Sequence, residues 1–196
     1  GNLTDASKFI SRILASVKSM TDLLDKVLTI SKSDTGEHKI KPILANTYDF
    51  CHSFVDEYKI LDKNNHNIYF ETTDDTKQQS YIDPGLLQQI LSNLLSNAIK
   101  YSPIDSDIVL SHKKEGSNLV FVVKDKGIGI PKDQIRYIFE PFYRATNTGI
   151  IQGSGLGLSI VKRCVDIYHG KIEVESQENI GTTVTVTIPE IFPEEE

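Results

Sequence analysis

The sequence predicts an α/β (α+β) two-layer sandwich, in which a mixed sheet carries helices on one face and is preceded by a long amphipathic bundle helix. Three observations lead to this prediction. Residues 2–33 contain neither Gly nor Pro and space their apolar side chains as a helix does. From residue 39 onward, helical and strand patterns are interspersed along the chain. Several strand pairs are separated only by short turns, which favours antiparallel hairpins.

The composition is that of a soluble chain with a core, because 39% of the 196 residues are apolar and 24% are charged. The formal net charge of -6 argues against a nucleic-acid partner, since binding to phosphates rests on clustered Lys and Arg. Cys51 and Cys164 lack CxxC spacing, so we expect neither a zinc site nor a disulfide and favour a cytoplasmic location. No apolar run approaches the ~20 residues of a membrane span, so any membrane anchor would lie outside this chain.

The first segment is expected to be one long helix in a bundle with several neighbours. A heptad-like seam runs along it, formed by Ile10, Ile13, Val17, Met20, Leu24 and Val27. Further apolar residues broaden this seam beyond the needs of a two-stranded coil. A single amphipathic helix packed on its own domain remains an alternative. Asp34-Thr-Gly36 ends the helix, which predicts an N-terminal segment of residues 1–36 and a second domain of residues 37–196.

The second domain is expected to begin with a helix over Ile43–Leu61, followed by a strand over Asn67–Thr72 and a short strand near Tyr81. Asp83-Pro84 marks the start of the next helix, which runs to about Tyr101, because Asp accepts bonds from the first free amides and Pro needs no donor there. The remaining elements are a strand pair, a helix and a final hairpin, expected at Ile108–Ser111 with Leu119–Lys124, Leu156–Tyr168, and Lys171–Ser176 with Thr182–Ile188.

Two carboxamides and one ammonium group share a side of the helix that starts at Asp83. Asn93, Asn97 and Lys100 are separated by steps of three or four residues, which return to the same side of a helix. Mg²⁺ prefers oxygen ligands and often bridges protein to phosphate, so both Asn side chains suit it, and Lys100 can offset phosphate charge. A pair of exposed polar residues on a half-buried helix gives the same pattern, and this alternative stays open.

A second motif, Asp125-Lys-Gly127-Ile-Gly129, follows directly on a strand. A carboxylate at this strand end can accept a hydrogen bond from an exocyclic amine. The two glycines let the backbone approach a ring or a phosphate closely. An ordinary turn after a strand would show the same residues.

A third motif, Gly153-Ser154-Gly155-Leu156-Gly157, opens a helix, where free backbone amides form a ready anion site. It matches neither GxGxxG with a downstream acid nor GxxxxGK[ST], so dinucleotide binding and the P-loop are disfavoured. The segment Phe139-Glu-Pro-Phe142-Tyr-Arg144 lies between the second and third motifs. In this order and spacing, the four stretches predict a pocket for a magnesium-bound nucleoside triphosphate.

Together the motifs resemble the ATP-binding domain of sensor histidine kinases, within the superfamily shared with DNA gyrase and mismatch-repair ATPases. The resemblance covers Lys39–Pro189. It implies that Asn93 and Asn97 hold Mg²⁺, that Lys100 and Tyr101 reach the phosphates or the ribose, and that Asp125 recognises adenine. Thr182-Thr183 would close the floor of the pocket. The other residues expected to contact ATP are Gly127, Gly129, Ile130, Gly153, Ser154, Gly155, Leu156, Gly157 and Thr183.

The same resemblance implies a mobile lid over residues 139–153, with Arg144 able to approach the terminal phosphate. A histidine nitrogen would attack the terminal phosphorus in line, and positioning by Asn93, Lys100 and Arg144 would supply most of the rate. Hydrolytic members of the superfamily have a Glu at the position of Asn93. Because a carboxamide is a poor base, slow hydrolysis is expected. The base that assists the acceptor is not assigned.

Residues 7–33 resemble the second helix of the family's dimerisation hairpin, including its Leu23-Leu24-Asp25-Lys26-Val27-Leu28 pattern. The acceptor His of the family lies on the preceding helix in an H-E-x-R-T-P-like context, and none of the five His residues here has such neighbours. We therefore expect a truncated kinase with its catalytic domain and half of the dimerisation module. The intact protein would form a homodimer and pass the phosphoryl group to a response regulator receiver domain.

Two alternatives remain open from the sequence alone. One is a protein serine kinase or mechanical ATPase built on the same pocket, which the dimerisation-like helix and the missing hydrolytic Glu disfavour. The other is a nucleotide-sensing or scaffolding module without catalysis, which the intact motifs disfavour.

Overall fold

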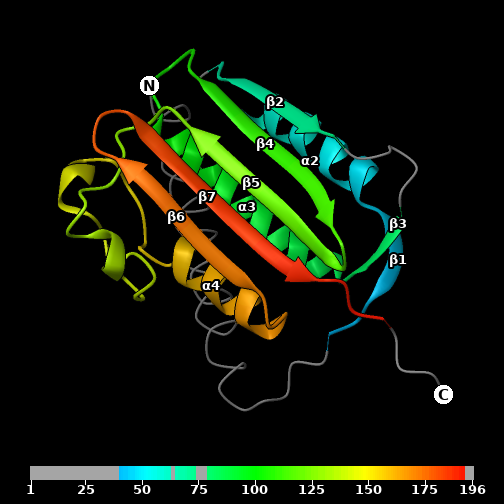
Figure 1. Cartoon of the computed structure of the whole chain (residues 1–196). Coiled ribbons are helices and arrows are strands. Elements are labelled where there is room, and N and C mark those ends of the chain that lie inside the picture. Colours follow the sequence, from blue (N-terminus) through cyan, green and yellow to red (C-terminus); the bar gives the residue numbers. More distant parts are fainter. Residues whose placement is uncertain (1–39, 63–64, 74–78, 193–196) are drawn as a thin grey trace, which may run out of the picture. The chain divides into compact units, whose positions relative to one another are not determined.

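The computed structural model describes residues 40–62, 65–73 and 79–192 (Figure 1). The helix expected over residues 7–33 and the boundary expected at residue 36 lie outside the described residues. The described elements are, in chain order, β1 (Ile43–Asn46), α2 (Thr47–Leu61), β2 (Asn67–Thr72), β3 (Gln79–Ile82), α3 (Pro84–Tyr101), β4 (Asp107–Glu115), β5 (Asn118–Asp125), two 3₁₀ turns η2 (Ile135–Tyr137) and η3 (Thr146–Thr148), α4 (Gly157–Ile167), β6 (Lys171–Gln177) and β7 (Gly181–Pro189).

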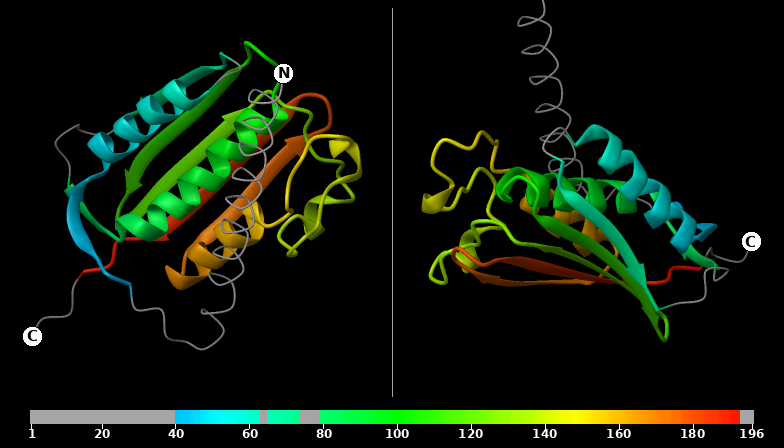
Figure 2. Two further views of the ribbon diagram at one scale, coloured as in Figure 1. Left: turned by 180° about the vertical axis from the view of Figure 1, so that it is seen from behind. Right: turned by 90° about the horizontal axis from the view of Figure 1, so that it is seen from above.

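The main sheet has five strands in the order β2-β4-β5-β7-β6. The β2–β4 pair is parallel and the other three pairs are antiparallel. The short strands β1 and β3 form a separate antiparallel pair. Figure 2 shows α2, α3 and α4 on the same face of the main sheet. The predicted fold class, a mixed sheet with helices on one face, is thus confirmed.

The core lies between the sheet and the helices. Leu119, Phe121 and Val123 lie on one face of β5 and are almost completely buried, as expected for the covered face of a strand. From α3, Leu87, Ile90, Leu91 and Leu95 are fully buried, and burial of each such side chain stabilises the fold by roughly 2 kcal/mol. The apolar side of α3 is thus packed into the core, which fixes the direction in which its polar side faces.

The predicted helix over Ile43–Leu61 is wrong at its start. Ile43–Asn46 forms β1, and the helix begins only at Thr47. The Asn46 side chain accepts hydrogen bonds from the backbone amides of Tyr48 and Asp49, at 3.0 and 3.2 Å. Asn favours this capping position, and its extended backbone allows the preceding residues to pair with β3.

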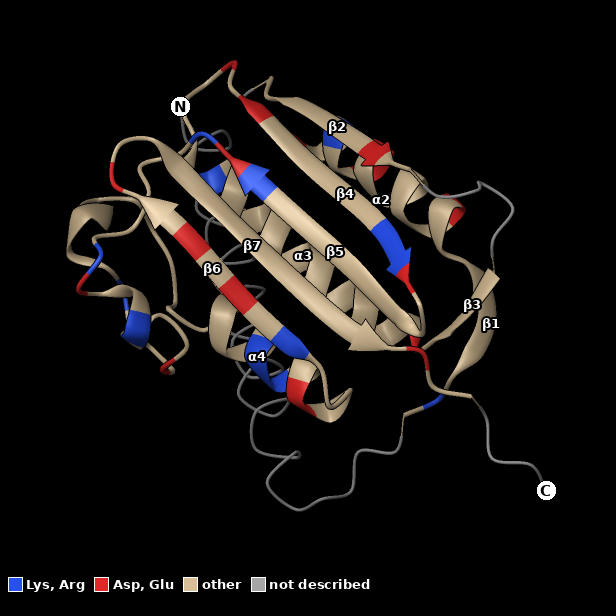
Figure 3. Ribbon diagram, in the orientation of Figure 1, with Lys and Arg blue, Asp and Glu red and all other residues tan. Residues whose placement is uncertain are grey.

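The edges of the main sheet are β2 and β6. On β6, Lys171, Glu173 and Glu175 are exposed and alternate with half-buried residues (Figure 3). Lys171 Nζ lies 2.8 Å from Glu173 Oε1. Among the described helices, none combines the length and the apolar character that crossing a bilayer would require.

Candidate functional site

The polar side of α3 carries Asn93, Asn97, Lys100 and Tyr101, which are all half-buried. Residues three or four apart lie on one side of a helix, so the four side chains follow a continuous stripe. Asn93 Nδ2 donates to the carbonyl oxygen of Gln89 at 2.8 Å, which fixes the orientation of this carboxamide. The local sequence therefore places the stripe as predicted.

The start of α4 lies against the two carboxamides. A Cβ atom at Gly157 would lie 3.3 Å from Asn97 Nδ2 and 3.4 Å from Asn93 Oδ1. Gly157 is the first residue of α4, and no side chain caps this end of the helix. The first amides of α4 therefore lie beside the Asn pair without a capping side chain, which is the arrangement that binds anions at helix starts.

Lys100 and Tyr101 meet the beginning of the third motif. Lys100 Nζ donates to the Tyr101 hydroxyl oxygen at 2.6 Å and lies 4.1 Å from the centre of the Tyr101 ring. A Cβ atom at Gly153 would lie 2.2 Å from Lys100 Nζ, so any side chain there would displace the ammonium group. The glycine thus allows the loop to pass directly over the Lys100 head group.

The Asp125 carboxylate, at the end of β5, is held by two backbone amides. Its Oδ1 accepts from Gly127 N at 2.8 Å and from Thr182 N at 3.2 Å. The same turn is bound to the end of α3, because Ile128 N donates to the Tyr101 carbonyl oxygen at 3.1 Å. The second motif is therefore anchored to β7 and to the helix that carries the Asn stripe.

Two opposing effects act on the Asp125 carboxyl. Burial raises its pKa, and the hydrogen bonds from Gly127 and Thr182 oppose this rise. Both of these donors bind Oδ1, and none of the other described residues donates to Oδ2. This oxygen is thus suited to accept a hydrogen bond from a ligand amine.

Gly129 and Ile130 run against the end of β6. Gly129 has φ of +64°, and a Cβ atom there would lie 2.0 Å from the Gln177 carbonyl oxygen, so this close approach requires glycine. Ile130 N donates to Ser176 Oγ at 2.9 Å. These contacts hold the end of the second motif and Ile130 against β6.

Thr182 and Thr183 point to opposite faces of the sheet. Thr182 shares the helix-covered face with Val184, and its Oγ1 lies 2.9 Å from Ser176 Oγ. Side chains alternate along a strand, so Thr183 lies on the other face. The structure therefore does not bring Thr183 to the other candidate residues, and Thr182 takes its place beside Asp125.

The expected lid, residues 139–153, is a loop with one 3₁₀ turn that is bonded to the second motif. Asn147 Nδ2 donates to the Gly129 carbonyl oxygen at 3.0 Å. The Arg144 guanidinium donates to the carbonyl oxygen of Ile151 and to Thr148 Oγ1, within the loop itself. The structure thus does not bring Arg144 to the stripe on α3.

The middle of the third motif is packed rather than open. Gly155 has φ of +73°, and a Cβ atom there would lie 2.6 Å from the backbone of Phe142. Leu156 is fully buried, so its side chain belongs to the core. Ser154 is exposed, and its Oγ accepts from Leu156 N at 3.4 Å. Leu156 could thus meet a ligand only through its backbone.

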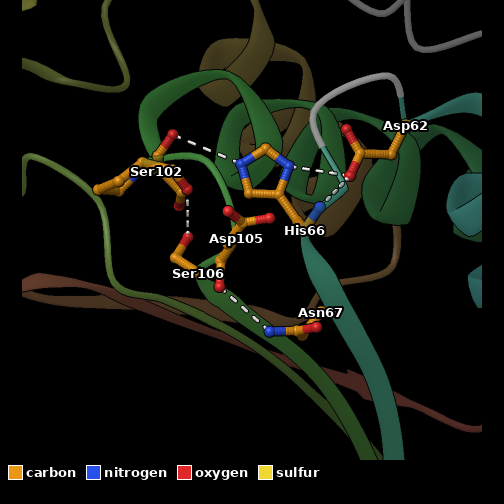
Figure 4. A network of polar contacts seen from close by, with 7 residues as sticks. Asp62, His66, Asn67, Ser102, Asp105 and Ser106 are labelled. Carbon is orange, nitrogen blue, oxygen red and sulfur yellow. Dashed lines mark hydrogen bonds and ion pairs between the residues drawn. The ribbon is translucent and has the colours of Figure 1, made fainter.

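The end of α3 is tied down by a buried Asp–His pair, shown in Figure 4. The side chains of Asp62 and His66 are 2% and 0% exposed, and His66 Nδ1 lies 2.9 Å from Asp62 Oδ2. The backbone amide of His66 donates to the same oxygen at 2.6 Å. On its other side, His66 Nε2 lies 3.5 Å from the Ser102 carbonyl oxygen. The pair links the start of β2 to the residue that follows the Lys100–Tyr101 end of α3.

Several residues that organise the site lie outside the sequence motifs and were not predicted. Gln134 holds the lid by donating to Thr146 Oγ1 and accepting from Thr146 N, at 2.8 and 2.9 Å. Ser176 and Asn147 join the second motif to β6 and to the lid. Each contact bridges segments that the sequence does not link by any periodic pattern, so only the fold reveals them.

The donor set fits a magnesium-bound nucleoside triphosphate. Among the described residues, no three His, Cys, Asp or Glu side chains gather to hold a metal. A cation at the stripe would therefore depend on Asn oxygens and on oxygens of the ligand, which is how Mg²⁺ is often bound. Gly157, beside both carboxamides, leaves space that a Cβ atom would fill.

A family described as "Histidine kinase-, DNA gyrase B-, and HSP90-like ATPase" matches residues 82–191, which is more than half of the chain. The chain belongs to this ATPase family. Within the family, both curated relatives below are named as sensor or sensor-like histidine kinases, and one solved structure below is the catalytic domain of a histidine kinase. The described domain is a histidine kinase catalytic domain. This confirms the resemblance carried by the motifs.

Two curated relatives match nearly the whole chain. Sensor-like histidine kinase SenX3 of Mycolicibacterium smegmatis is 32% identical over 191 residues, which are 96% of this chain and 49% of the relative. Sensor histidine kinase WalK of Bacillus subtilis is 32% identical over 188 residues, which are 94% of this chain and 31% of the relative. The chain thus spans at most about half the length of these relatives.

Two solved structures share the fold. Full-length ShkA in complex with AMPPNP aligns with a TM-score of 0.83 at 20% identity, over 94% of this chain and 38% of that one. The catalytic domain of histidine kinase ThkA aligns with a TM-score of 0.65 at 28% identity, over 76% of this chain and 96% of that one.

Proposed function

We propose that this chain binds Mg-ATP and transfers the γ-phosphoryl group to a histidine on a dimerisation domain, for relay to a response regulator receiver domain. The observation that carries the proposal is that α3 contacts both the second motif (residues 125–129) and the third motif (residues 153–157). The second motif is bonded to the Tyr101 carbonyl, and the third lies against Lys100 and the Asn pair. Residues 7–33 would supply half of the dimerisation hairpin of a homodimer.

Each side chain has a defined part in this proposal. Asp125 accepts a hydrogen bond from the exocyclic amine of adenine through Oδ2. Asn97 and Asn93 hold Mg²⁺, which when bound neutralises charge on the phosphoryl oxygens. Lys100 and the first amides of α4 face the phosphates. Because Asn93 is a carboxamide and not a carboxylate, it cannot take a proton from water, and hydrolysis should be slow.

Binding is tested first by thermal unfolding with and without Mg-ATP. A ligand at ~100 times its dissociation constant stabilises the folded state by about 2.7 kcal/mol. Asn97→Ala should lose the magnesium-dependent part of this stabilisation. Gln88→Ala, which removes an exposed carboxamide from the same helix, should keep it. Unchanged Mg-ATP affinity in Asn97→Ala would refute the metal assignment. If Mg-ATP does not raise the unfolding temperature of the wild-type chain, every proposed ATP-dependent function is contradicted.

Phosphoryl transfer is tested with labelled ATP and a separately supplied helix that bears an acceptor His. We expect an acid-labile label on the supplied helix, and none when Asn97→Ala replaces the wild-type chain. An acid-stable label would instead indicate a serine kinase. ATP binding without any label would indicate a nucleotide-sensing module.

A further inference from the structure

The helices α3 and α4 meet near both ends and in the middle of their packed faces. Tyr168, directly after α4, meets Asp83, which caps the start of α3. Midway, Cys164 Sγ donates to Gln89 Oε1 at 3.3 Å, and burial raises the pKa of this thiol to about 12, so it keeps its proton. At the far end, Gly157 lies against the Asn pair. The two helices therefore run in opposite directions, with the candidate site at one end of their contact.

The Tyr168 hydroxyl forms a two-way link with the backbone of Asp83. Its oxygen accepts from Asp83 N at 2.8 Å, and its proton is donated to the Asp83 carbonyl oxygen, 3.0 Å away. Tyr168 is 1% exposed. Burial raises the pKa of this hydroxyl, so it remains protonated and able to donate.

Asp83 is itself firmly held, which makes it a fixed point for this link. Its carboxylate accepts from the backbone amides of Lys41, Gly85 and Leu86, at 2.9, 3.0 and 3.1 Å. The amides of Gly85 and Leu86 belong to the first turn of α3. Any sliding of α4 along α3 would therefore break the bonds of Tyr168 before it moved Asp83.

We propose that Tyr168 is a positioning residue for nucleotide binding, whose hydroxyl sets the register of α4 along α3 and so holds the first amides of α4 beside Asn93 and Asn97. A slip of one residue would move the start of α4 by about 1.5 Å. Magnesium demands near-ideal ligand geometry, so such a slip would disrupt the site. This inference rests on the proposed binding of Mg-ATP.

The test compares two substitutions that each remove one tyrosine hydroxyl bonded to α3. Tyr168→Phe keeps the buried ring and removes the link from α4. Tyr58→Phe is the matched control, because the Tyr58 hydroxyl donates to the Ser92 carbonyl oxygen at 3.4 Å from α2. Circular dichroism first establishes that both variants are folded at the temperature used. Calorimetry then measures Mg-ATP affinity, and hydrogen exchange follows the amides of residues 156–163.

We expect Tyr168→Phe to bind Mg-ATP about fivefold more weakly, which corresponds to the loss of roughly one net hydrogen bond. Exchange at the start of α4 should also be faster. Tyr58→Phe should retain wild-type affinity and wild-type exchange at the start of α4, even if its unfolding temperature falls as much as that of Tyr168→Phe.

Wild-type affinity and wild-type exchange in Tyr168→Phe would overturn the positioning role and leave the proposed function standing. An equal loss of affinity in both variants would overturn it too, because that loss would follow general destabilisation. A wild-type chain that binds no Mg-ATP would overturn the proposed function, and the positioning role together with it.

Discussion

At the scale of single residues, the Asp125 carboxyl lies where burial and hydrogen bonding oppose each other. Burial raises its pKa above the ordinary value of about 3.9, although two amides bind Oδ1. A raised pKa means that ionisation disfavours the folded state. The stability contributed by this group is complete below about pH 4 and is lost as the pH rises through the raised pKa.

Asp125→Asn should therefore stabilise the domain without nucleotide at pH 7, because Asn keeps an acceptor for the amides of Gly127 and Thr182 and removes the desolvated charge. Urea unfolding should show this gain at pH 7 and its decline as the pH falls toward 4. Calorimetry at pH 7 should show weaker Mg-ATP binding, since the acceptor for adenine is changed. Wild-type nucleotide affinity in this variant would exclude Asp125 as the adenine contact.

At the scale of elements, the start of α4 is where helix geometry and the candidate site coincide. A Cβ atom at Gly157 would lie between 3.3 and 3.5 Å from the two carboxamides, so an alanine needs only small adjustments to fit. Alanine also has a higher helix propensity than glycine. Fold and stability should thus survive the change, while the methyl group fills space beside Asn93 and Asn97.

Gly157→Ala is expected to weaken Mg-ATP binding by about tenfold or more, or about 1.4 kcal/mol, while the unfolding midpoint without ligand stays within a few degrees. Gly85→Ala is the matched control. Gly85 lies in the first turn of α3, and its Cβ would meet Asp83 Oδ1 at the same 3.3 Å. If both variants bind Mg-ATP as the wild-type chain does, the space beside Gly157 has no role in binding.

Elements with their own periodic pattern were predictable, and elements defined by partners were not. The three- and four-residue spacing of α3 predicted both its buried face and the stripe of Asn93, Asn97 and Lys100. The apolar residues of β1 form too short a run to distinguish strand from helix, and only pairing with β3 decides it. Thr182 and Thr183 are neighbours in the sequence, and only the strand register shows that Thr182, and not Thr183, lies beside Asp125.

At the scale of the whole described domain, contacts between distant segments decide how the site is supported. Tyr168 and Asp83 are 85 residues apart, and no pattern in the sequence links them. Asp62 and His66 are only four residues apart on the chain, but His66 reaches Ser102 only after folding. The sequence thus predicted the groups that would meet a ligand, and the fold was needed to find what holds them.

Among the described residues, the His52–Asp56 and Asp62–His66 pairs have the same four-residue spacing and opposite environments, which allows a direct test of this support. Asp62→Ala should lower the free energy of unfolding by about 2 kcal/mol or more, because buried donors of His66 lose their acceptor. Asp56→Ala disrupts the exposed pair with His52 and should cost less than about 1 kcal/mol. Urea unfolding measures both. Equal losses would show that the buried pair adds no special support.

The charged edge strand β6 has a consequence for how copies of this domain behave when crowded. An open strand edge has unpaired backbone amides and carbonyls that can pair with a strand of another polypeptide chain. A second copy that tried to add its own β6 there would bring the acidic side chains Glu173 and Glu175 close to their counterparts. Pairing of two copies through their β6 edges should therefore be disfavoured even in concentrated samples.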